Sequence, residues 1–322
     1  MAHNRHKLAF VMDPIEAESF AASTTLVLMH EAQKRGHEVL YIDPGELCIA
    51  GGRAAAWGTP VRLNWKNEQV EKGDPRFLVL DEEVDAVFQR KDPPVDSDYV
   101  VATQILGSCR RSLVFNRPAS VLAYNEKLFA LHFREWMPET IVTRSLDQLR
   151  AFMKGMGGQM IVKPLDGKGG EGIFHLVEGE RNVSSILEQA TAFQTRHAMA
   201  QRYLPEVREG DKRILLLEGE PIGALMRVPA PSEVRANLHV GGQARQVGLD
   251  DRDREILEAV SPVMAREGLF FVGIDVIGGY LTEVNVTSPT GVQEINALEG
   301  VHLEAAILER VEKRLDERTV SE

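Results

Sequence analysis

The sequence predicts an α/β protein, with a parallel sheet in its N-terminal part and an α+β arrangement of hairpins in its C-terminal part. Three stretches carry this prediction. A strand, a helix and a second strand follow one another over residues 8–43, the spacing of a βαβ unit. Residues 160–177 and residues 271–286 each have the pattern of two strands joined by a glycine-containing turn.

The N-terminal third supplies the parallel strands. The predicted elements are a strand at 8–12, a helix at 24–35 that ends before Gly36, and strands at 38–43, 86–88 and 113–115. Residues 45–73 are polar and only weakly periodic, which predicts an excursion from the sheet or a small hairpin.

Polar residues follow two of these strands, at the edge where open α/β sheets bind ligands. Asp13 follows the first strand, and Arg90 and Lys91 follow the strand at 86–88. Two adjacent cations suit a substrate carboxylate, although ordinary loop charges would give the same pattern. The residues alone leave both interpretations open.

Composition describes an acidic globular chain. Its 322 residues are 43% hydrophobic and 26% charged, with a formal net charge of −11. Nucleic acid and anionic membranes both require a basic surface, so neither is expected as a partner. Cys48 and Cys109 form no spacing motif, and no stretch is apolar enough for a membrane span or a secretion signal. We therefore expect a cytoplasmic protein.

A helix near the middle of the chain begins with a lysine. Residues 125–136 are predicted to be helical with Asn125 as N-cap, which places Lys127 in the first turn. The helix dipole disfavours a cation there, so Lys127 is either solvated or faces a phosphate. A second helix follows from the capping box formed by Ser145 and Gln148.

A glycine-rich turn between two strands is the clearest functional feature of the middle third. It reads Lys163-Pro-Leu-Asp-Gly167-Lys-Gly169-Gly170-Glu-Gly172, and its first lysine ends a strand. Glycines allow a tight loop whose free N–H groups can cradle an anion. No Gly-Lys-Ser/Thr opens a helix here and a strand follows, which excludes the two common nucleotide-binding fingerprints. A hairpin that covers phosphates fits the pattern, and a flexible hairpin without a ligand is the alternative.

Three features extend this pattern toward the C-terminus. Residues 198–204 form a strand that ends at a proline, and its edge is suited to a planar base. Arg213 and Arg227 lie on the neighbouring strands of a hairpin, and paired arginines suit carboxylate or phosphate. Residues 228–245 lack periodicity and contain glycines, so we predict a lid.

The hairpin at residues 271–286 carries oxygen ligands. It turns at Gly278-Gly279, and Glu283 and Asn285 face one side because they lie two residues apart on a strand. Asp275 on the partner strand can reach the same face, and hard cations such as Mg²⁺ prefer such oxygens. A hairpin with one solvated polar face would show the same alternation.

The last predicted element is an amphipathic helix over residues 301–315. One side of this helix carries Val301, Ala305, Leu308, Val311 and Leu315. Packing of this face against the protein's own core is favoured over a subunit interface.

Seven short motifs occur one after another along both halves of the chain. They are Val11-Met-Asp-Pro-Ile15, Arg90-Lys-Asp-Pro-Pro94, Asn125-Glu-Lys-Leu-Phe129, Lys163-Pro-Leu-Asp-Gly167, Gly210-Asp-Lys-Arg213, Phe271-Val-Gly-Ile-Asp275 and Leu281-Thr-Glu-Val-Asn-Val-Thr-Ser-Pro-Thr290. This order resembles the ATP-grasp superfamily of carboxylate–amine ligases. Within it, the chain is similar to the bacterial glutathione synthetase family over nearly its whole length.

The resemblance implies an ATP-grasp fold preceded by an N-terminal parallel-sheet (pre-ATP-grasp) domain. On this basis we expect an N-terminal α/β substrate domain over residues 1–122 and a central ATP-grasp subdomain with the glycine-rich loop over residues 123–204. A C-terminal subdomain over residues 205–322 would then contain the lid at 228–245 and the metal site.

The resemblance also implies ligation of γ-glutamylcysteine with glycine, driven by ATP as co-substrate, through an acyl phosphate. It implies two Mg²⁺ ions, with Mn²⁺ as an alternative, held by Asp275, Glu283 and Asn285. Contacts to ATP are implied for Lys127, Lys163, Gly167, Gly169, Gly170, Gln201, Tyr203 and Leu204. Catalytic neutralisation of the phosphoryl group or binding of carboxylates is implied for Arg213, Arg227 and Arg235. Substrate contacts are implied for Asp13, Arg90, Asn237, Ser288 and Thr290, and a homo-oligomer (dimer or tetramer) is a family expectation.

Two positions depart from the family pattern. Lys168 stands inside the glycine-rich loop, where an uncharged residue is expected, and Ala236 stands between Arg235 and Asn237, where glycine is expected. Neither belongs to the metal set, but both bear on the motion of the loop and the lid. A ligase of the same architecture with another peptide or amino-acid substrate is the main alternative. A non-catalytic nucleotide-binding protein is disfavoured, because the metal set and both lysines are present.

Overall fold

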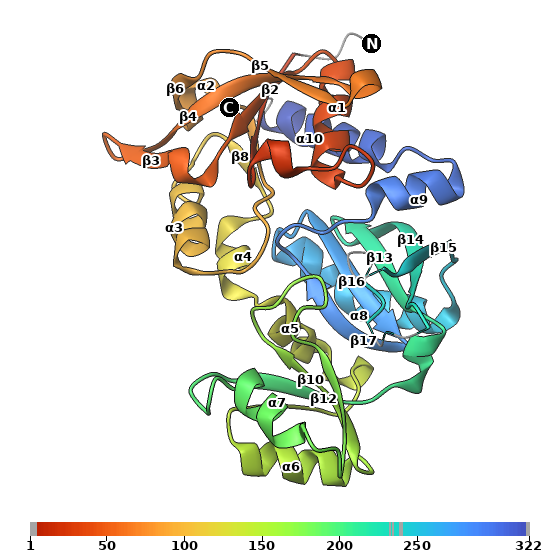
Figure 1. The fold of residues 1–322 in the computed structure, drawn as a ribbon. Helices are drawn as coiled ribbons and strands as arrows, with labels where there is room; N and C mark the ends of the chain where they lie inside the picture. The colour runs from red at the N-terminus through yellow and green to blue at the C-terminus, as the bar shows by residue number, and fades with distance from the viewer. Residues whose placement is uncertain (1–4, 232, 234, 238–240, 320–322) are drawn as a thin grey trace.

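The computed structural model describes residues 5–231, 233, 235–237 and 241–319. Three sheets follow one another along the molecule: eight strands at the N-terminal end, five strands in the middle and four strands at the far end (Figure 1). No helix within the described ranges is long and apolar enough to cross a membrane.

The N-terminal sheet contains the predicted parallel strands. Its members are β1 (Lys7–Val11), β2 (Glu38–Ile42), β3 (Leu47–Ala50), β4 (Arg53–Asn64), β5 (Gln69–Lys72), β6 (Arg76–Val79), β7 (Ala86–Gln89) and β8 (Leu113–Phe115). β2, β1, β7 and β8 pair in parallel. Residues 45–73 are more than the predicted excursion or small hairpin, because the long strand β4 pairs with β2, β3, β5 and β6 along its length.

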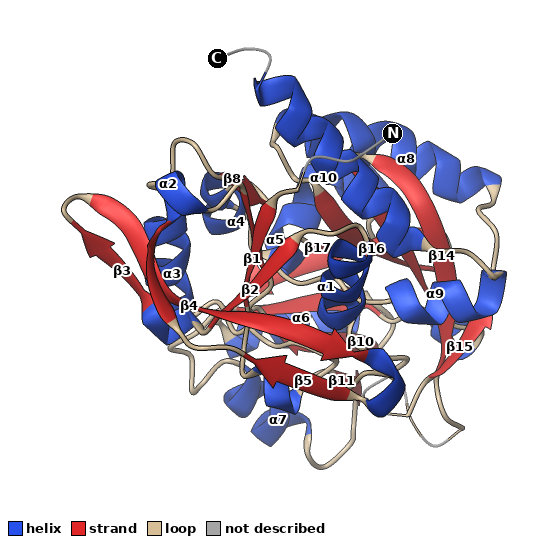
Figure 2. Ribbon diagram, turned by 90° about the horizontal axis from the view of Figure 1, so that it is seen from above, coloured by secondary structure: helices blue, strands red, loops and turns tan. Residues whose placement is uncertain are grey.

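Helices from both ends of the chain cover this sheet. They are α1 (Thr24–Lys34), α2 (Leu80–Glu83), α3 (Ser97–Leu106), α4 (Pro118–Ala123) and α10 (Leu303–Thr319), with short 3-10 turns η1 (Ile15–Ala17), η2 (Pro44–Glu46) and η3 (Trp65–Asn67). α9 (Val292–Glu299) precedes α10 and packs on the edge of the five-stranded sheet described below. Figures 1 and 2 both place α10 beside α1, and Leu308, Val311 and Leu315 enter a core shared with the N-terminal sheet. The predicted packing of the last helix on the protein's own core is confirmed, although the helix begins at Leu303 and leaves Val301 exposed.

The middle third of the chain forms the four-stranded antiparallel sheet at the far end of the molecule, in the order β11-β10-β12-β9. Its elements are α5 (Glu126–Phe129), η4 (Ala130–Trp136), β9 (Thr140–Thr143), α6 (Leu146–Gly155), β10 (Gln159–Pro164), β11 (Phe174–Val177), α7 (Val183–Ala190) and β12 (Ala198–Arg202). The prediction of one helix over 125–136 is wrong, because the α-helix ends at Phe129 and Phe133 has non-helical angles (φ −116°, ψ 37°). The break lets both phenylalanine rings enter one core.

The five-stranded antiparallel sheet lies between the other two. It has the order β15-β14-β13-β16-β17, formed by β13 (Asp211–Leu217), β14 (Glu220–Val228), β15 (Gln243–Gln246), β16 (Phe271–Ile277) and β17 (Tyr280–Asn285). η5 (Pro205–Arg208) precedes it, and α8 (Asp251–Arg266) packs on one face through Ile256, Val260 and Met264. Residues 243–245 of the predicted lid are therefore strand, and residues 232, 234 and 238–240 of that lid lie outside the described residues. The predictions do not include α3, α4, α7, α8 and α9.

Candidate active site

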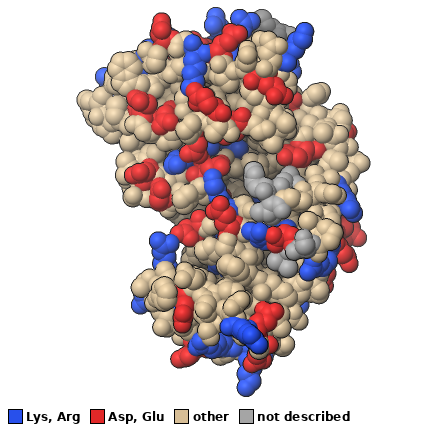
Figure 3. Space-filling view, in the orientation of Figure 1, with Lys and Arg blue, Asp and Glu red and all other residues tan. Residues whose placement is uncertain are grey.

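A cavity of about 600 Å³ lies between the glycine-rich loop and the five-stranded sheet. All the predicted site residues line it except Asp13 and Arg90. Basic and acidic side chains gather around the hollow in the middle of the face shown in Figure 3. Segments far apart in the chain thus converge on one space.

The predicted metal ligands lie on the paired strands β16 and β17. The register sets Asp275 opposite Glu283, and the Asn285 side-chain nitrogen donates to Oδ2 of Asp275 (3.3 Å). Gly278 and Gly279 form the turn with φ of +55° and +76°, as the hairpin prediction requires. Two carboxylates and an amide oxygen are the donor chemistry of Mg²⁺, so these residues fit the implied ion. No cluster of three His, Cys, Asp or Glu is found within the described ranges.

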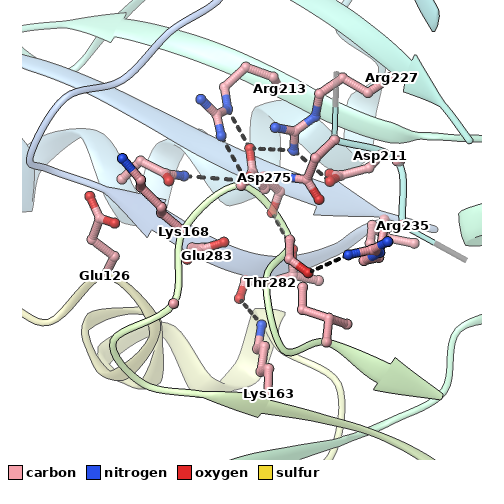
Figure 4. A pocket seen from close by; sticks show the side chains of 18 of the residues that line it. Glu126, Lys163, Lys168, Asp211, Arg213, Arg227, Arg235, Asp275, Thr282 and Glu283 are labelled. Carbon is pink, nitrogen blue, oxygen red and sulfur yellow. Dashed lines mark hydrogen bonds and ion pairs between the residues drawn. The ribbon is translucent and has the colours of Figure 1, made fainter. Parts of the chain in front are cut away.

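Two arginines converge on Asp275 (Figure 4). Nε and Nη2 of Arg213 donate to its two oxygens at 2.5 and 3.0 Å, and Nη2 of Arg227 lies 3.0 Å from Oδ1. The three residues are at most 6% exposed. Burial alone would raise the pKa of Asp275, but the two guanidinium groups outweigh it and hold that pKa below its usual range. Asp275 is therefore ionised and rigidly oriented.

Asp211 is a site residue that the sequence analysis missed. It lines the cavity, and its Oδ2 accepts a hydrogen bond from Nη2 of Arg227 (2.5 Å). Its Oδ1 and the Nε of Arg227 are buried without a hydrogen-bond partner in the described part of the chain. Burial raises the pKa of Asp211 to about 6 despite the neighbouring Arg227. Its position two residues before Arg213 on one strand was the available signal, because such residues share a face.

The two predicted lysines are both buried in the wall of the cavity. Nζ of Lys127 donates to the carbonyl of Gly167 (2.7 Å) and lies 3.1 Å from a carboxylate oxygen of Glu283. Nζ of Lys163 donates to the carbonyl of Thr282 (3.1 Å), and burial lowers its pKa. No carboxylate within the described ranges lies within 4.0 Å of that nitrogen, so its charge is available to an anion in the cavity.

The glycine-rich loop and the described part of the lid touch each other. Nη1 of Arg235 donates to the carbonyl of Gly170 (3.4 Å). A Cβ added at Gly170 would lie 2.5 Å from the Asn237 side-chain oxygen, so only glycine permits this approach. Gly169 and Gly170 have φ of +58° and +85°, which L side chains rarely adopt. The cover of the cavity therefore depends on glycine at these positions.

The far end of the cavity is formed by the strand segment that follows Ala200. Gln201 is buried and donates to the Thr140 hydroxyl (3.1 Å), Tyr203 stacks on His175 with ring centroids 3.9 Å apart, and Leu204 is 5% exposed. An aromatic ring and an aliphatic side chain beside an amide suit a planar base.

Asp13 and Arg90 lie behind the cavity wall. Asp13 accepts from the backbone N–H of Asp92 (2.8 Å) and pairs with Lys91 (3.3 Å). Arg90 is 6% exposed and donates to the carbonyl of Pro289 (3.0 Å), while the Ser288 hydroxyl donates to the carbonyl of Arg90 (3.3 Å). Burial lowers the pKa of Arg90 to about 10. Both residues therefore brace loops that line the cavity, instead of lining it themselves.

Glu126 is a second residue that the sequence analysis did not assign. Its Oε1 accepts from the N–H groups of Val286 and Thr287 and from the Thr287 hydroxyl, at 2.8–3.0 Å. Burial and the nearby Glu283 raise its pKa. Glu126 thereby joins the helix that carries Lys127 to the segment that follows β17. Its position in the sequence, next to Lys127, gave no signal that its side chain is buried.

Two family models match the chain almost from end to end. Residues 6–121 match the N-terminal domain of prokaryotic glutathione synthetase, and residues 126–300 match its ATP-grasp domain. The chain belongs to the prokaryotic glutathione synthetase family. It is 45% identical to the glutathione synthetase of Gloeobacter violaceus, over 94% of this chain and 95% of that one. It is 43% identical to that of Synechocystis sp., over 96% of this chain and 99% of that one.

Solved structures place the fold among ATP-grasp proteins. The chain is similar to a D-cycloserine synthetase with a TM-score of 0.67 and 14% identity, over 96% of this chain and 99% of that one. It is similar to a RimK domain ATP-grasp protein from Sphaerobacter thermophilus with a TM-score of 0.63 and 15% identity, over 94% and 98%. These likenesses establish the ATP-grasp fold that the resemblance implied.

Proposed function

We propose that this member of the prokaryotic glutathione synthetase family joins γ-glutamylcysteine to glycine at the expense of ATP. The observation that carries the proposal is the convergence of both family domains on one cavity. The ATP-grasp domain lines it with Lys127, Lys163 and Asp275, and the N-terminal domain lines it with Ala22 and Asp92. A carboxylate is a poor electrophile, and phosphorylation gives it a good leaving group. The amine of glycine then displaces phosphate from the acyl phosphate.

Each wall of the cavity takes a separate part of this reaction. Lys127, Lys163 and the N–H groups of Gly167, Gly169 and Gly170 bind the phosphates of ATP, and the wall of Gln201, Tyr203 and Leu204 binds adenine. Asp275, Glu283 and Asn285 would hold two Mg²⁺ ions, or Mn²⁺, which supply neutralisation of the phosphate charge. Arg213, Arg227 and Arg235 orient the transferred phosphoryl group.

The substrates enter between the covering loops and the turn after β17. Ser288, Thr290 and Asn237 contact the peptide and the acceptor. For Asp13 and Arg90 we propose an indirect role, since their hydrogen bonds fix the neighbouring loops. Contact between Arg235 and Gly170 supports a cover that excludes water from the acyl phosphate.

We further propose the division into an N-terminal substrate domain (1–122), a central ATP-grasp subdomain (123–204) and a C-terminal subdomain (205–322). The three sheets support this division, although α10 packs on the N-terminal sheet. The chain would act in the cytoplasm as a homo-oligomer.

The test measures ADP release by the purified protein with ATP, Mg²⁺, γ-glutamylcysteine and glycine, with each component omitted in turn. We expect turnover only when all four are present, with one glutathione formed for each ADP. ADP release that does not require the peptide, or the use of a different acceptor in place of glycine, would contradict the proposal.

A further inference from the structure

One side chain of the glycine-rich loop reaches across the mouth of the cavity to the N-terminal sheet. Nζ of Lys168 lies 3.0 Å from Oδ2 of Asp92, which belongs to the segment after β7. Both residues line the cavity, and their side chains are 43% and 45% exposed. The ion pair therefore joins two separate parts of the fold at the entrance, where solvent reaches it.

The two ends of this bridge differ in rigidity. Asp92 is fixed because its backbone N–H donates to Asp13 (2.8 Å) and Asp13 pairs with Lys91. Lys168 stands among glycines with positive φ, at Gly169, Gly170 and Gly172, so the backbone there can change conformation at little cost. The bridge thus tethers a flexible loop to a fixed point.

The direction of Lys168 separates it from the phosphate-binding lysines. Figure 4 shows its amine directed away from Asp275 and Glu283. Lys127, in contrast, reaches Glu283 at 3.1 Å from inside the cavity wall. We therefore assign Lys168 to holding the loop in place. Its amine does not point toward the predicted metal ligands Asp275 and Glu283.

We propose that the ion pair between Lys168 and Asp92 is a clasp that holds the glycine-rich loop closed over the cavity and limits loss of the acyl phosphate to water. The clasp rests on the proposed ligase function. When the loop opens, water attacks the acyl phosphate, phosphate leaves, and the peptide carboxylate is regenerated, so ATP is consumed without product. Lys168 and Asp92 are positioning residues in this scheme.

The first test measures coupling, as ADP formed and glutathione formed in the same reaction, at 50 and 500 mM KCl. The variants are Lys168→Met, Asp92→Asn and the charge reversal Asp92→Lys with Lys168→Asp. An exposed ion pair shifts a closed population by about two- to fivefold, so each single variant should raise the uncoupled share of ADP by that factor. The reversal should restore coupling, and high salt should uncouple the unchanged protein but not Lys168→Met.

The second test measures loop opening without turnover, as deuterium uptake by residues 164–173 in the absence of substrates. We expect uptake about two- to fivefold faster in Lys168→Met and Asp92→Asn. A matched control is Arg254→Met, which removes an exposed ion pair to Asp251 (2.7 Å) within α8, and we expect it to change neither measurement.

Several results would overturn the clasp. Unchanged coupling and uptake in Lys168→Met would do so. An effect of Lys168→Met that Asp92→Asn does not share, or a raised KM for ATP with normal coupling, would assign Lys168 to phosphate. Equal effects in Arg254→Met would mean a general charge effect. If the unchanged protein releases ADP without a peptide, the ligase function itself fails, whereas deuterium uptake still reports whether the pair holds the loop.

Discussion

The floor and the cover of the cavity are built in opposite ways. The floor consists of β13, β14, β16 and β17, where Arg213, Arg227 and Asp275 are at most 6% exposed and bonded to one another. Each of these strands has paired neighbours, so the side chains have little freedom. The floor is preorganised before any ligand arrives.

The cover consists of the glycine-rich loop and the described part of the lid. Its contacts include the 3.4 Å bond from Arg235 to Gly170, the bond from Lys127 to the carbonyl of Gly167, and the exposed pair of Lys168 with Asp92. Its backbone uses glycines at positive φ, which no strand of the floor does between its ends. The cover can therefore open and close while the floor stays fixed.

This difference assigns the two demands of the chemistry to different parts of the molecule. Transition-state charge is stabilised best by groups that need no reorganisation, which the floor provides. Exclusion of water requires a part that moves between substrate entry and reaction, and we expect the cover to be this part. Changes in the floor should therefore lower kcat, and changes in the cover should alter KM and coupling.

The largest effect is expected in the floor at Glu283. We expect Glu283→Ala to lower ATP turnover at least about a thousandfold, because a metal ligand and the partner of Lys127 are lost together. The fold should persist, since the Glu283 side chain is 21% exposed and is not part of a hydrophobic core. ADP release and a thermal melt of the same sample measure the two quantities.

The matched control for this variant is Glu255→Ala. Glu255 is an exposed glutamate on α8 that pairs with Arg252, three residues earlier on the same helix. Its loss should leave turnover and melting temperature nearly unchanged. A folded Glu283→Ala protein with full activity would remove Glu283 from the metal set.

A smaller loss is expected from Arg213→Lys. Lysine keeps the charge but cannot make the two-pronged contact to Asp275, so the carboxylate loses its fixed orientation. We expect kcat to fall about a hundredfold with little change in KM for ATP. Lys212→Arg, on the opposite face of β13 beside Asp250 and Asp253, is the control that should stay active. Equal losses in both variants would indicate general damage to β13.

Asp211→Asn tests the electrostatics of the floor through pH. Burial raises the pKa of Asp211 to about 6, above the 3.8 of the free side chain, so the folded protein binds this proton more tightly. Asp211 therefore adds to the free energy of unfolding at low pH. This contribution, on the order of 2 kcal/mol, is lost as the pH rises from about 4 to 6. The free energy of unfolding, measured with urea from pH 4.5 to 7.5, should fall with rising pH through this group only in the unchanged protein and not in Asp211→Asn. Parallel curves would contradict the raised pKa.

The sequence predicts the floor better than the cover for a physical reason. Alternation along a strand assigns Glu283 and Asn285 to one face with no knowledge of other strands. The glycine pair at 278–279 predicts the turn, but Asp275 lies opposite Glu283 only because the register shifts between Asp275 and Val276. The same rule applied to β13 would have added Asp211 beside Arg213. Local pattern therefore assigns the face of each residue on a strand, whereas the register shift that aligns Asp275 with Glu283 is seen only in the structure.

Long-range packing sets the parts that the sequence leaves undetermined. The burial of Arg90 behind Pro289 depends on contact between residues about 200 positions apart, and no local pattern encodes it. The break at Phe133 depends on two rings that share one core. Residues 243–245 form a strand because they pair with the outer edge of β14. In each case tertiary contacts override the local preference.

The smallest effect is expected in the cover, at Ala236. Ala236 is buried at 3% exposure between Arg235 and Asn237, both of which touch Gly170. Glycine in its place adds backbone freedom of about 0.5–1 kcal/mol to the open lid, which must be lost on closure. We expect Ala236→Gly to raise KM for ATP about two- to fivefold while kcat stays within twofold.

The control for this variant separates lid freedom from general loss of stability. Ala306 is exposed on α10, so Ala306→Gly should lower the free energy of unfolding by about 1 kcal/mol and leave KM for ATP unchanged. If Ala236→Gly instead lowers kcat a hundredfold, the lid belongs with the floor as part of the preorganised machinery. An unchanged KM would mean that closure of the cover does not limit ATP binding, and that Arg235 and Asn237 hold their positions without help from Ala236.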